Sequence, residues 1–301
     1  MTKNKIKQTN KGGSTLGKEK ELRLLAEQIR VAALEEFAAL GFGHVGGAMS
    51  LVETLAVLYG GAMRVDPAQP AWAERDRLVV SKGHAGPAVY ATLALKGYFP
   101  REELLTLNKP GTRLPSHCDR LKTPGIDMTT GSLGQGMSTA CGLALGQRMD
   151  GTGARTFLIL GDGECDEGQV WEGALFAPHH KLDNLIAFCD NNGQQLDGYV
   201  KNVLDTGDIT AKFAAFGWYA QTVDGHDVEA LDAAVTRALA WKGAPSMIVL
   251  KTVKGKGCPF VEGREFNHHV QFTKEEMDEA LAGARAVLKA AEAAVRGGAQ
   301  A

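Results

Sequence analysis

Short apolar runs alternate with amphipathic segments along most of this chain. Each apolar run is bounded by polar or turn residues, and the runs predict buried strands at 78–80, 157–160, 185–188, 218–223 and 246–253. The intervening segments predict helices at 18–40, 50–63, 86–96, 101–107, 134–149, 228–241 and 273–296. Because strands and helices alternate almost throughout, we expect an α/β fold, doubly wound, with a mostly parallel sheet and helices on both faces.

Local signals refine this outline. Ser50 precedes Glu53 by three residues, and Thr273 precedes Glu276 in the same way, which predicts a capping box at the start of each helix. Residues 109–130 combine prolines and glycines with polar residues and predict a long loop, a kind of segment that is often functional. The helix at 134–149 is rich in small residues, which favours tight packing on the sheet or a subunit interface equally.

The ends of the chain and its composition limit the classes of function. Residues 1–17 are polar and lysine-rich without an apolar core, so they predict a flexible tail rather than a signal peptide, and 18–301 is expected to be a single domain. No stretch approaches the ~18 apolar residues of a membrane span. A formal net charge of -2 argues against a nucleic-acid partner. The five cysteines form no CxxC pair, and their odd number favours a reducing cytoplasm.

Two strand ends carry the most informative pattern. The run at 157–160 leads into Gly161-Asp162-Gly163, and the run at 185–188 ends in Asp190-Asn191-Asn192. Two apolar runs around one helix predict a βαβ unit, whose parallel strands end at the same edge of the sheet. Asp162 and Asn192 are therefore expected to lie side by side, where a carboxylate and an amide oxygen provide half of a hard-cation site. A backbone carbonyl and the phosphate oxygens of a ligand would complete it.

A structural explanation of the same residues is available. Asp-Gly is a common turn, and Asn-Asn often ends a strand. Glu164, Asp166 and Glu167 add carboxylates next to the first motif, but acidic residues also suit the start of a helix. The pairing of both motifs at strand ends is what favours a functional site.

Most of the eight histidines follow the ends of predicted elements, where active sites of α/β folds gather. These are His44, His84, His117, His226 and the pair His268-His269. A neutral imidazole both donates and accepts a hydrogen bond, which suits proton transfer at cellular pH. Taken singly, each is explained by packing or solvation, but as a set beside a cation site they predict an active site. His179 and His180, within a helix, are expected to be structural.

In combination these motifs resemble those of transketolases, in the part that binds thiamine diphosphate. In the family's order, the chain contains GHVGG (43–47), SKGHA (81–85), SHCD (116–119), GSLGQG (131–136), GDGECDEG (161–168), DNN (190–192) and NHH (267–269). The resemblance covers about residues 20 to 270, nearly the whole chain.

The resemblance implies a role for each matching residue. Asp162, Asn192 and the carbonyl of Gln194 would bind Mg²⁺ or Ca²⁺. Cofactor contacts would come from Gly163, His84 and Asn192 at the diphosphate, from backbone groups of Gly131 and Leu133 at the aminopyrimidine, and from Glu167, a carboxylate at the interface between paired sites. His44, His117 and His268 would face the hydroxyls of the substrate and the reacting carbon.

The resemblance also implies a partner. In the family, the glutamate that activates the cofactor lies on a second, pyrimidine-binding domain, which this chain does not resemble. We therefore expect a split enzyme in which a separate C-terminal transketolase subunit carries that domain, in a heterotetramer with two copies of each chain. The implied reaction transfers a two-carbon unit from a ketose, expected to be phosphorylated, to an aldose.

Two departures and three alternatives remain. Ser116-His117-Cys118 stands where the family usually has Gly-His-Pro, and Asn267 stands where Trp is common, so the sugar specificity is open. A 1-deoxyxylulose-phosphate synthase is normally a single long chain, and the α subunit of a 2-oxo acid dehydrogenase is disfavoured by the SKGHA and GSLGQG segments. The rival from another class is a non-catalytic cofactor-binding or regulatory relative, and the intact Asp162, Asn192 and histidines argue against it.

Overall fold

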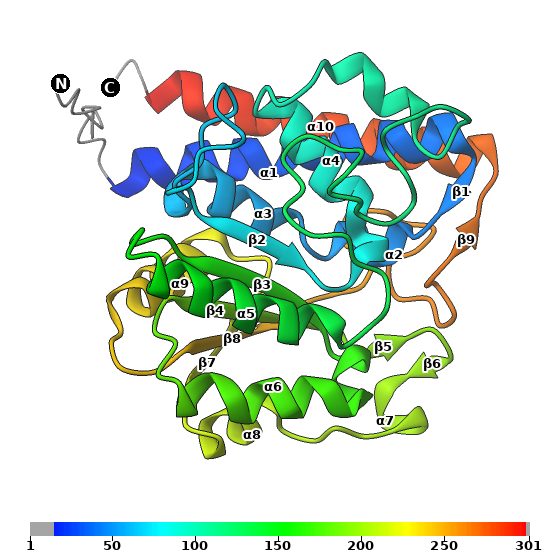
Figure 1. Ribbon diagram of the computed structural model, residues 1–301. Helices are drawn as coiled ribbons and strands as arrows, with labels where there is room; N and C mark the ends of the chain where they lie inside the picture. The colour runs from blue at the N-terminus through cyan, green and yellow to red at the C-terminus, as the bar shows by residue number, and fades with distance from the viewer. Residues whose placement is uncertain (1–14, 299–301) are drawn as a thin grey trace, which may run out of the picture.

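Five parallel strands form the main sheet of the computed structural model, which describes residues 15–298 (Figure 1). They are β2 (Arg77–Val80), β3 (Thr156–Gly161), β4 (Leu185–Asn191), β7 (Tyr219–Asp224) and β8 (Ser246–Lys251). Their order across the sheet is β2-β3-β4-β8-β7, and each neighbouring pair is parallel. The parallel sheet predicted from the apolar runs is therefore confirmed.

Helices cover both faces of this sheet. One face carries α1 (Thr15–Leu40), α3 (Val52–Val57), α4 (Gly86–Leu95), α9 (Val228–Ala240) and α10 (Lys274–Gly298); the other carries α5 (Gln135–Met149), α6 (Gly168–His179) and α8 (Ile209–Ala215). In Figure 1, α1, α4 and α10 lie above the sheet, and α6 and α8 lie below it. The predicted doubly wound arrangement is thus confirmed.

The strands are apolar without interruption because both faces of the sheet are buried. Phe157 and Ile159 of β3 pack with the helices of the α1 side, whereas Leu158 and Leu160 pack with α5 and α6. This alternation follows from the pleat, which points successive side chains to opposite faces.

Short elements connect and edge this framework. They include α2 (Val45–Met49), α7 (Val200–Val203), a π-helical turn (Leu58–Ala62) and 3-10 turns at Gly83–Ala85, Arg101–Thr106 and Gly163–Asp166. Two small antiparallel pairs join β1 (Phe42–Gly43) to β9 (Val270–Gln271) and β5 (Gln194–Gln195) to β6 (Gly198–Tyr199). The β1–β9 pair brings His44 next to the segment 267–269.

One predicted capping box is confirmed and the other is wrong. At α10 the Thr273 amide donates to Glu276 Oε2 (2.9 Å) and the Glu276 amide donates to Thr273 Oγ1 (3.2 Å). Ser50 is instead buried and donates to Asp190 Oδ2 (2.6 Å), and Glu53 pairs with Arg30. Both side chains bind polar partners that are distant in the sequence and buried in the interior, so neither side chain caps a helix.

The small residues of α5 face two environments. A Cβ on Gly136 would lie 2.3 Å from Ser81 Oγ, so only glycine allows this approach to β2. Ala140 and Ala144 are fully buried. Gly142 and Gly146 would place a Cβ in open space. Tight packing, one of the two explanations left open by the sequence, is therefore observed on one side of α5, while the other side is free.

Two further predictions concern the ends and the membrane. The structure begins α1 at Thr15, within the predicted tail 1–17, and residues 1–14 lie outside the described residues. Among the helices of residues 15–298, none combines the length and apolar character that crossing a membrane requires.

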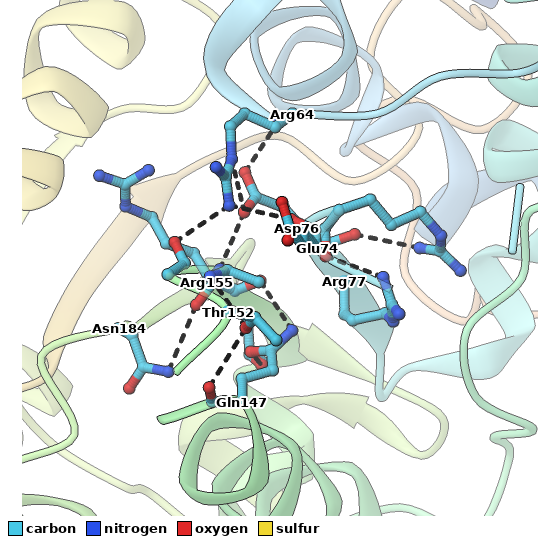
Figure 2. A network of polar contacts seen from close by, with 12 residues as sticks. Arg64, Glu74, Asp76, Arg77, Gln147, Thr152, Arg155 and Asn184 are labelled. Carbon is cyan, nitrogen blue, oxygen red and sulfur yellow. Dashed lines mark hydrogen bonds and ion pairs between the residues drawn. The ribbon is translucent and has the colours of Figure 1, made fainter. Parts of the chain in front are cut away.

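A polar network fixes the edge of the sheet where β2 and β3 begin (Figure 2). Buried Asp76 accepts hydrogen bonds from the amides of Arg64 and Arg155, both at 2.8 Å. The Arg64 guanidinium donates to the carbonyls of Glu74 (2.9 Å) and Gly153 (3.0 Å). One buried carboxylate therefore holds the starts of both strands together.

Candidate active site

A cavity of about 300 Å³ opens at the carboxyl edge of the sheet. The loops that follow β2, β3, β4 and β8 form its walls. Most of the predicted site residues line it, namely His84, Leu133, Asp162, Gly163, Glu167, Asn192, Gln194 and His268. His44 and His117 do not line the cavity itself but lie beside His84, which does, and Gly131 lies beside His117.

Asp162 and Asn192 lie side by side, as the βαβ pattern predicted. The Gly193 amide, next to Asn192, donates to Asp162 Oδ2 at 2.5 Å, and the Asp162 amide donates to the Asp190 carbonyl at 3.2 Å. Asn192 Oδ1 accepts from the Gln194 amide at 3.0 Å. All three residues predicted to bind the metal therefore line one cavity at the ends of β3 and β4.

Asp162 is a buried carboxylate that no cationic side chain of the described residues neutralises. It accepts hydrogen bonds from the amides of Gly163 (2.8 Å) and Gly193 (2.5 Å), and no side chain of the described residues donates to it. Burial, and then the negative charge of Asp190, raise its pKa to about 6 in spite of these bonds. A bound divalent cation would relieve both effects.

The donor set suits a hard cation that also binds phosphate. Within residues 15–298, no group of three or more His, Cys, Asp or Glu side chains is arranged to hold a metal ion by itself. A cation beside Asp162 would therefore need amide, carbonyl and ligand oxygens, which are the ligands that Mg²⁺ and Ca²⁺ accept.

The charge of Asp190, in contrast, is neutralised by Lys82. The Lys82 ammonium pairs with Asp190 Oδ2, and Ser50 and Thr252 donate to the same carboxylate. Burial opposes ionisation, but Lys82 and these hydrogen bonds hold the pKa of Asp190 below its ordinary value. No role for Lys82 was predicted from the sequence, although it stands in the SKGHA segment.

A second lysine, Lys254, also lines the cavity and was missed. It follows β8 in a loop rich in glycine and lysine, and its ammonium lies 3.4 Å from the Gln195 carbonyl. Burial, and then the charge of Lys82, lower its pKa to about 8. Lys82 and Lys254 together give one wall of the cavity a positive charge that suits an anionic ligand.

Five histidines form a cluster centred on His44. The His44 ring centroid lies 5.5 Å from those of His84 and His117, 5.2 Å from that of His268 and 4.8 Å from that of His269. His84 and His268 lie 4.5 Å apart. The structure thus brings together, from four separate segments, the four histidines to which the resemblance gave a role, and the cluster also includes His269.

The remaining histidines lie elsewhere. His226 faces Glu53 (Nδ1–Oε2, 3.1 Å) and accepts the Val253 amide through Nε2 (2.8 Å), so it supports the loop after β8 rather than the cluster. His179 and His180 contact each other at the end of α6, with ring centroids 4.9 Å apart, as expected for structural residues.

Four imidazoles of the cluster, those of His44, His84, His117 and His268, are neutral at physiological pH. Burial, reinforced by neighbouring imidazoles and lysines, lowers the pKa of His44 to about 4 and that of His268 to about 3. Burial also lowers the pKa of His117 and, more strongly, that of His84. Each ring can therefore both donate and accept a hydrogen bond.

This cluster predicts acid sensitivity in the cofactor-free chain. As the pH falls below about 6.5, the unfolded chain protonates histidines that the folded chain keeps neutral. We expect the free energy of unfolding, measured by urea denaturation, to decrease from about pH 6.5 to about pH 4. A His44→Gln/His268→Gln variant should show a shallower decrease, and equal slopes for the two proteins would contradict this explanation.

Glycines and one further carboxylate shape the rest of the cavity. Gly131 has φ +142°, and a Cβ there would lie 3.2 Å from His117 Cδ2. Glu164 is buried and accepts from Ser81 Oγ and from the amides of Gly134 (2.8 Å) and Gly161 (3.0 Å). Glu164 therefore ties β2, β3 and the start of α5 together. From the sequence alone, its position at a helix start explained it.

Gly163 offers a test of this close packing. A Cβ at Gly163 would lie 2.5 Å from Gln195 Cβ, so Gly163→Ala should cost about 1–3 kcal/mol of stability. Gly168→Ala is the matched control, because a Cβ at Gly168 meets nothing within 4 Å. Thermal unfolding of both variants measures the difference, and equal midpoints would show that the loop after β3 yields freely.

Glu167 differs from the other acidic residues of the cavity. It is the N-cap of α6, and its side chain is exposed. Within residues 15–298, this side chain makes no hydrogen bond or ion pair. Its carboxylate is thus free to meet a group from outside the described chain.

Comparisons with known proteins agree on one family. Residues 22–284 match the family model described as "Transketolase, thiamine diphosphate binding domain". A 6-deoxy-6-sulfo-D-fructose transketolase subunit SqwG from Clostridium sp. (strain MSTE9) is 53% identical over 262 residues, covering 87% of this chain and 95% of that protein. An apulose-4-phosphate transketolase subunit from Phocaeicola vulgatus is 35% identical over 260 residues, covering 86% of this chain and 92% of that protein.

Solved structures agree with this assignment. The transketolase from Campylobacter jejuni superposes with a TM-score of 0.81 at 28% identity, over 91% of this chain and 46% of that one. The chain thus spans about half the length of that transketolase. On these grounds, the chain belongs to the transketolase family and contains its thiamine diphosphate-binding domain.

Proposed function

We propose that this chain is the diphosphate-binding subunit of a two-subunit transketolase, which transfers a two-carbon unit from a ketose to an aldose. One observation carries the proposal. Asp162, a buried carboxylate with a raised pKa and no cationic hydrogen-bond partner among the described residues, lies in a cavity next to a cluster of neutral histidines. The first group suits a metal-bound diphosphate, and the second suits a polyhydroxylated substrate.

Asp162, Asn192 and the carbonyl of Gln194 would hold Mg²⁺, or Ca²⁺ in its place. Lys82 and Lys254 face the same cavity and suit the charge of a diphosphate, with Gly163 and His84 beside it. Gly131 and Leu133 would meet the aminopyrimidine through their backbone groups. When bound, thiamine diphosphate supplies the carbanion chemistry of ketol transfer.

His44, His117 and His268 would handle the substrate. Because their imidazoles are neutral, each can accept a proton from a hydroxyl or donate a hydrogen bond to a carbonyl oxygen. The His44 ring centroid lies 5.5 Å from that of His117 and 5.2 Å from that of His268, so the three imidazoles can act on one substrate molecule.

A second polypeptide would complete the site. We expect it to carry the pyrimidine-binding domain and the carboxylic acid that activates the cofactor, in a heterotetramer with two copies of each chain. The exposed Glu167 is the residue expected to lie at the interface between paired sites. The five cysteines are free and buried, which is consistent with the cytoplasm as the location.

The donor sugar is expected to end in an anionic group. Two relatives are named for a sulfonated ketose and for a ketose phosphate. Because the first is 53% identical, 6-deoxy-6-sulfofructose is the first donor to test, with fructose 6-phosphate as its matched comparison. Ser116, Cys118 and Asn267, the departures from the family pattern, lie next to His117 and His268 and are the positions to exchange if neither sugar reacts.

A single reconstitution experiment tests the split. The purified chain, loaded with thiamine diphosphate and Mg²⁺, is assayed with both donors and an aldose acceptor, alone and with a co-expressed pyrimidine-domain polypeptide encoded by a neighbouring gene. We expect turnover only in the mixture, because this chain holds the cofactor without the group that activates it. Substantial ketol transfer by the chain alone would refute the two-subunit proposal.

A further inference from the structure

A second cavity, of about 350 Å³, lies at the amino edge of the sheet, opposite the candidate active site. Its walls are the end of α5, the loop before β3, the loop before β4 and the loop after α9. Among its lining residues are Arg148, Arg155 and Lys242 but only one carboxylate, Asp183. We propose that this cavity binds a small phosphomonoester.

The positive charge here is local rather than general. The whole chain has a formal net charge of -2, so three cations against one carboxylate around a single cavity is a concentration of charge. Asp183 accepts the Gly243 amide at 3.1 Å through Oδ2 and keeps its charge, so the three cations leave an excess of two positive charges. The excess is therefore available to an anionic ligand.

Two of the cations have no partner within residues 15–298. No hydrogen bond or ion pair is recorded for the guanidinium of Arg155 or for the ammonium of Lys242, and Figure 2 shows no dashed line at the Arg155 guanidinium. The backbone of Arg155 is nevertheless fixed, because its amide donates to buried Asp76 at 2.8 Å. Arg155 is thus a positioned cation whose head group is free.

The third cation is oriented by the protein. Arg148 Nη1 donates to the carbonyls of His180 (2.5 Å) and Lys181 (3.1 Å), which fixes the guanidinium across the cavity. A guanidinium has five N–H donors, so others remain for a phosphate oxygen. An arginine held in this way binds a dianion with less loss of side-chain freedom than a mobile one.

The walls are preformed. Thr152 Oγ1 donates to the Gln147 carbonyl (3.2 Å), and Gln147 Oε1 accepts from Thr156 Oγ1 (2.7 Å), which closes the loop between α5 and β3. The Arg64 guanidinium holds the Gly153 carbonyl from the other side at 3.0 Å. Little ordering of the chain is therefore needed when a ligand enters.

Calorimetry with sn-glycerol 3-phosphate tests the proposal, because this ester has no carbonyl and cannot act as donor or acceptor in ketol transfer. The full chain is first saturated with thiamine diphosphate and Mg²⁺, so that the candidate active site does not contribute. We expect one further site, weakened at least about tenfold in an Arg155→Gln/Lys242→Gln variant. Lys109→Gln/Lys289→Gln, which removes the same charge from exposed positions, should bind as the unaltered chain does.

The outcomes are distinct. Absence of binding to the cofactor-saturated chain, or an equal loss in the Lys109/Lys289 control, would overturn the site. If the double variant fails to fold by circular dichroism, Lys242→Gln alone carries the test, because Lys242 is exposed. None of these results depends on whether the chain performs ketol transfer.

Discussion

Replacing Asp162 with alanine is expected to abolish the metal-dependent binding of thiamine diphosphate. Asp162 is buried, and no cationic side chain of the described residues donates a hydrogen bond to it, whereas Asp190 is neutralised by Lys82. Without Asp162, a divalent cation would keep only neutral oxygens from the protein. We expect calorimetry in the presence of Mg²⁺ to show a loss of affinity of more than about 100-fold.

Two controls separate the metal role from a structural one. Asp197→Ala removes an exposed carboxylate from the same cavity and should leave the affinity unchanged. Asp162→Asn keeps the size of the side chain and an acceptor for one of the two amides, since Gly163 donates to Oδ1 and Gly193 to Oδ2; its unfolding midpoint should therefore fall less than that of Asp162→Ala, while its metal-dependent affinity falls as well. Normal affinity in Asp162→Ala would rule out the metal role.

The strands were predictable because their environment is uniform. β3 and β4 are buried on both faces, so each appears in the sequence as a continuous apolar run that ends in polar residues. The carboxyl edge of a parallel sheet then gathers those polar ends by geometry alone. For this reason, the sequence alone predicts that Asp162 and Asn192 lie side by side.

The lysines could not be placed in the same way. Lys82, Ser50, Asp190 and Thr252 meet around one carboxylate, but they come from four segments that only the folded chain brings together. Local sequence signals also misled at Ser50, where a capping-box spacing coincides with a residue that serves this buried network. Charged groups that are paired in the interior carry no periodicity, which is the signal that sequence analysis uses.

The histidine cluster, too, was only partly predictable from the sequence. Its members were recognised as candidates from their positions after element ends, but the antiparallel pairing of β1 with β9 is what places His269 4.8 Å from His44. Strands of two residues leave almost no pattern in the sequence. His226 was equally plausible on position alone, and its contact with Glu53 removes it from the site.

Replacing His117 with alanine is expected to reduce turnover far more than cofactor affinity. Its ring lies 5.5 Å from that of His44 and 6.5 Å from that of His84, and His117 does not line the cavity that Asp162 and Asn192 share. The neutral ring is therefore placed to exchange protons with a substrate hydroxyl rather than to hold a diphosphate. In the enzyme reconstituted with its second polypeptide, we expect kcat to fall about 100-fold while the affinity for thiamine diphosphate changes less than about threefold. His180→Ala, at the end of α6, is the control and should leave both quantities unchanged. An unchanged kcat in His117→Ala would show that the cluster packs the site without taking part in the reaction, whereas a parallel loss of affinity would assign His117 to the cofactor.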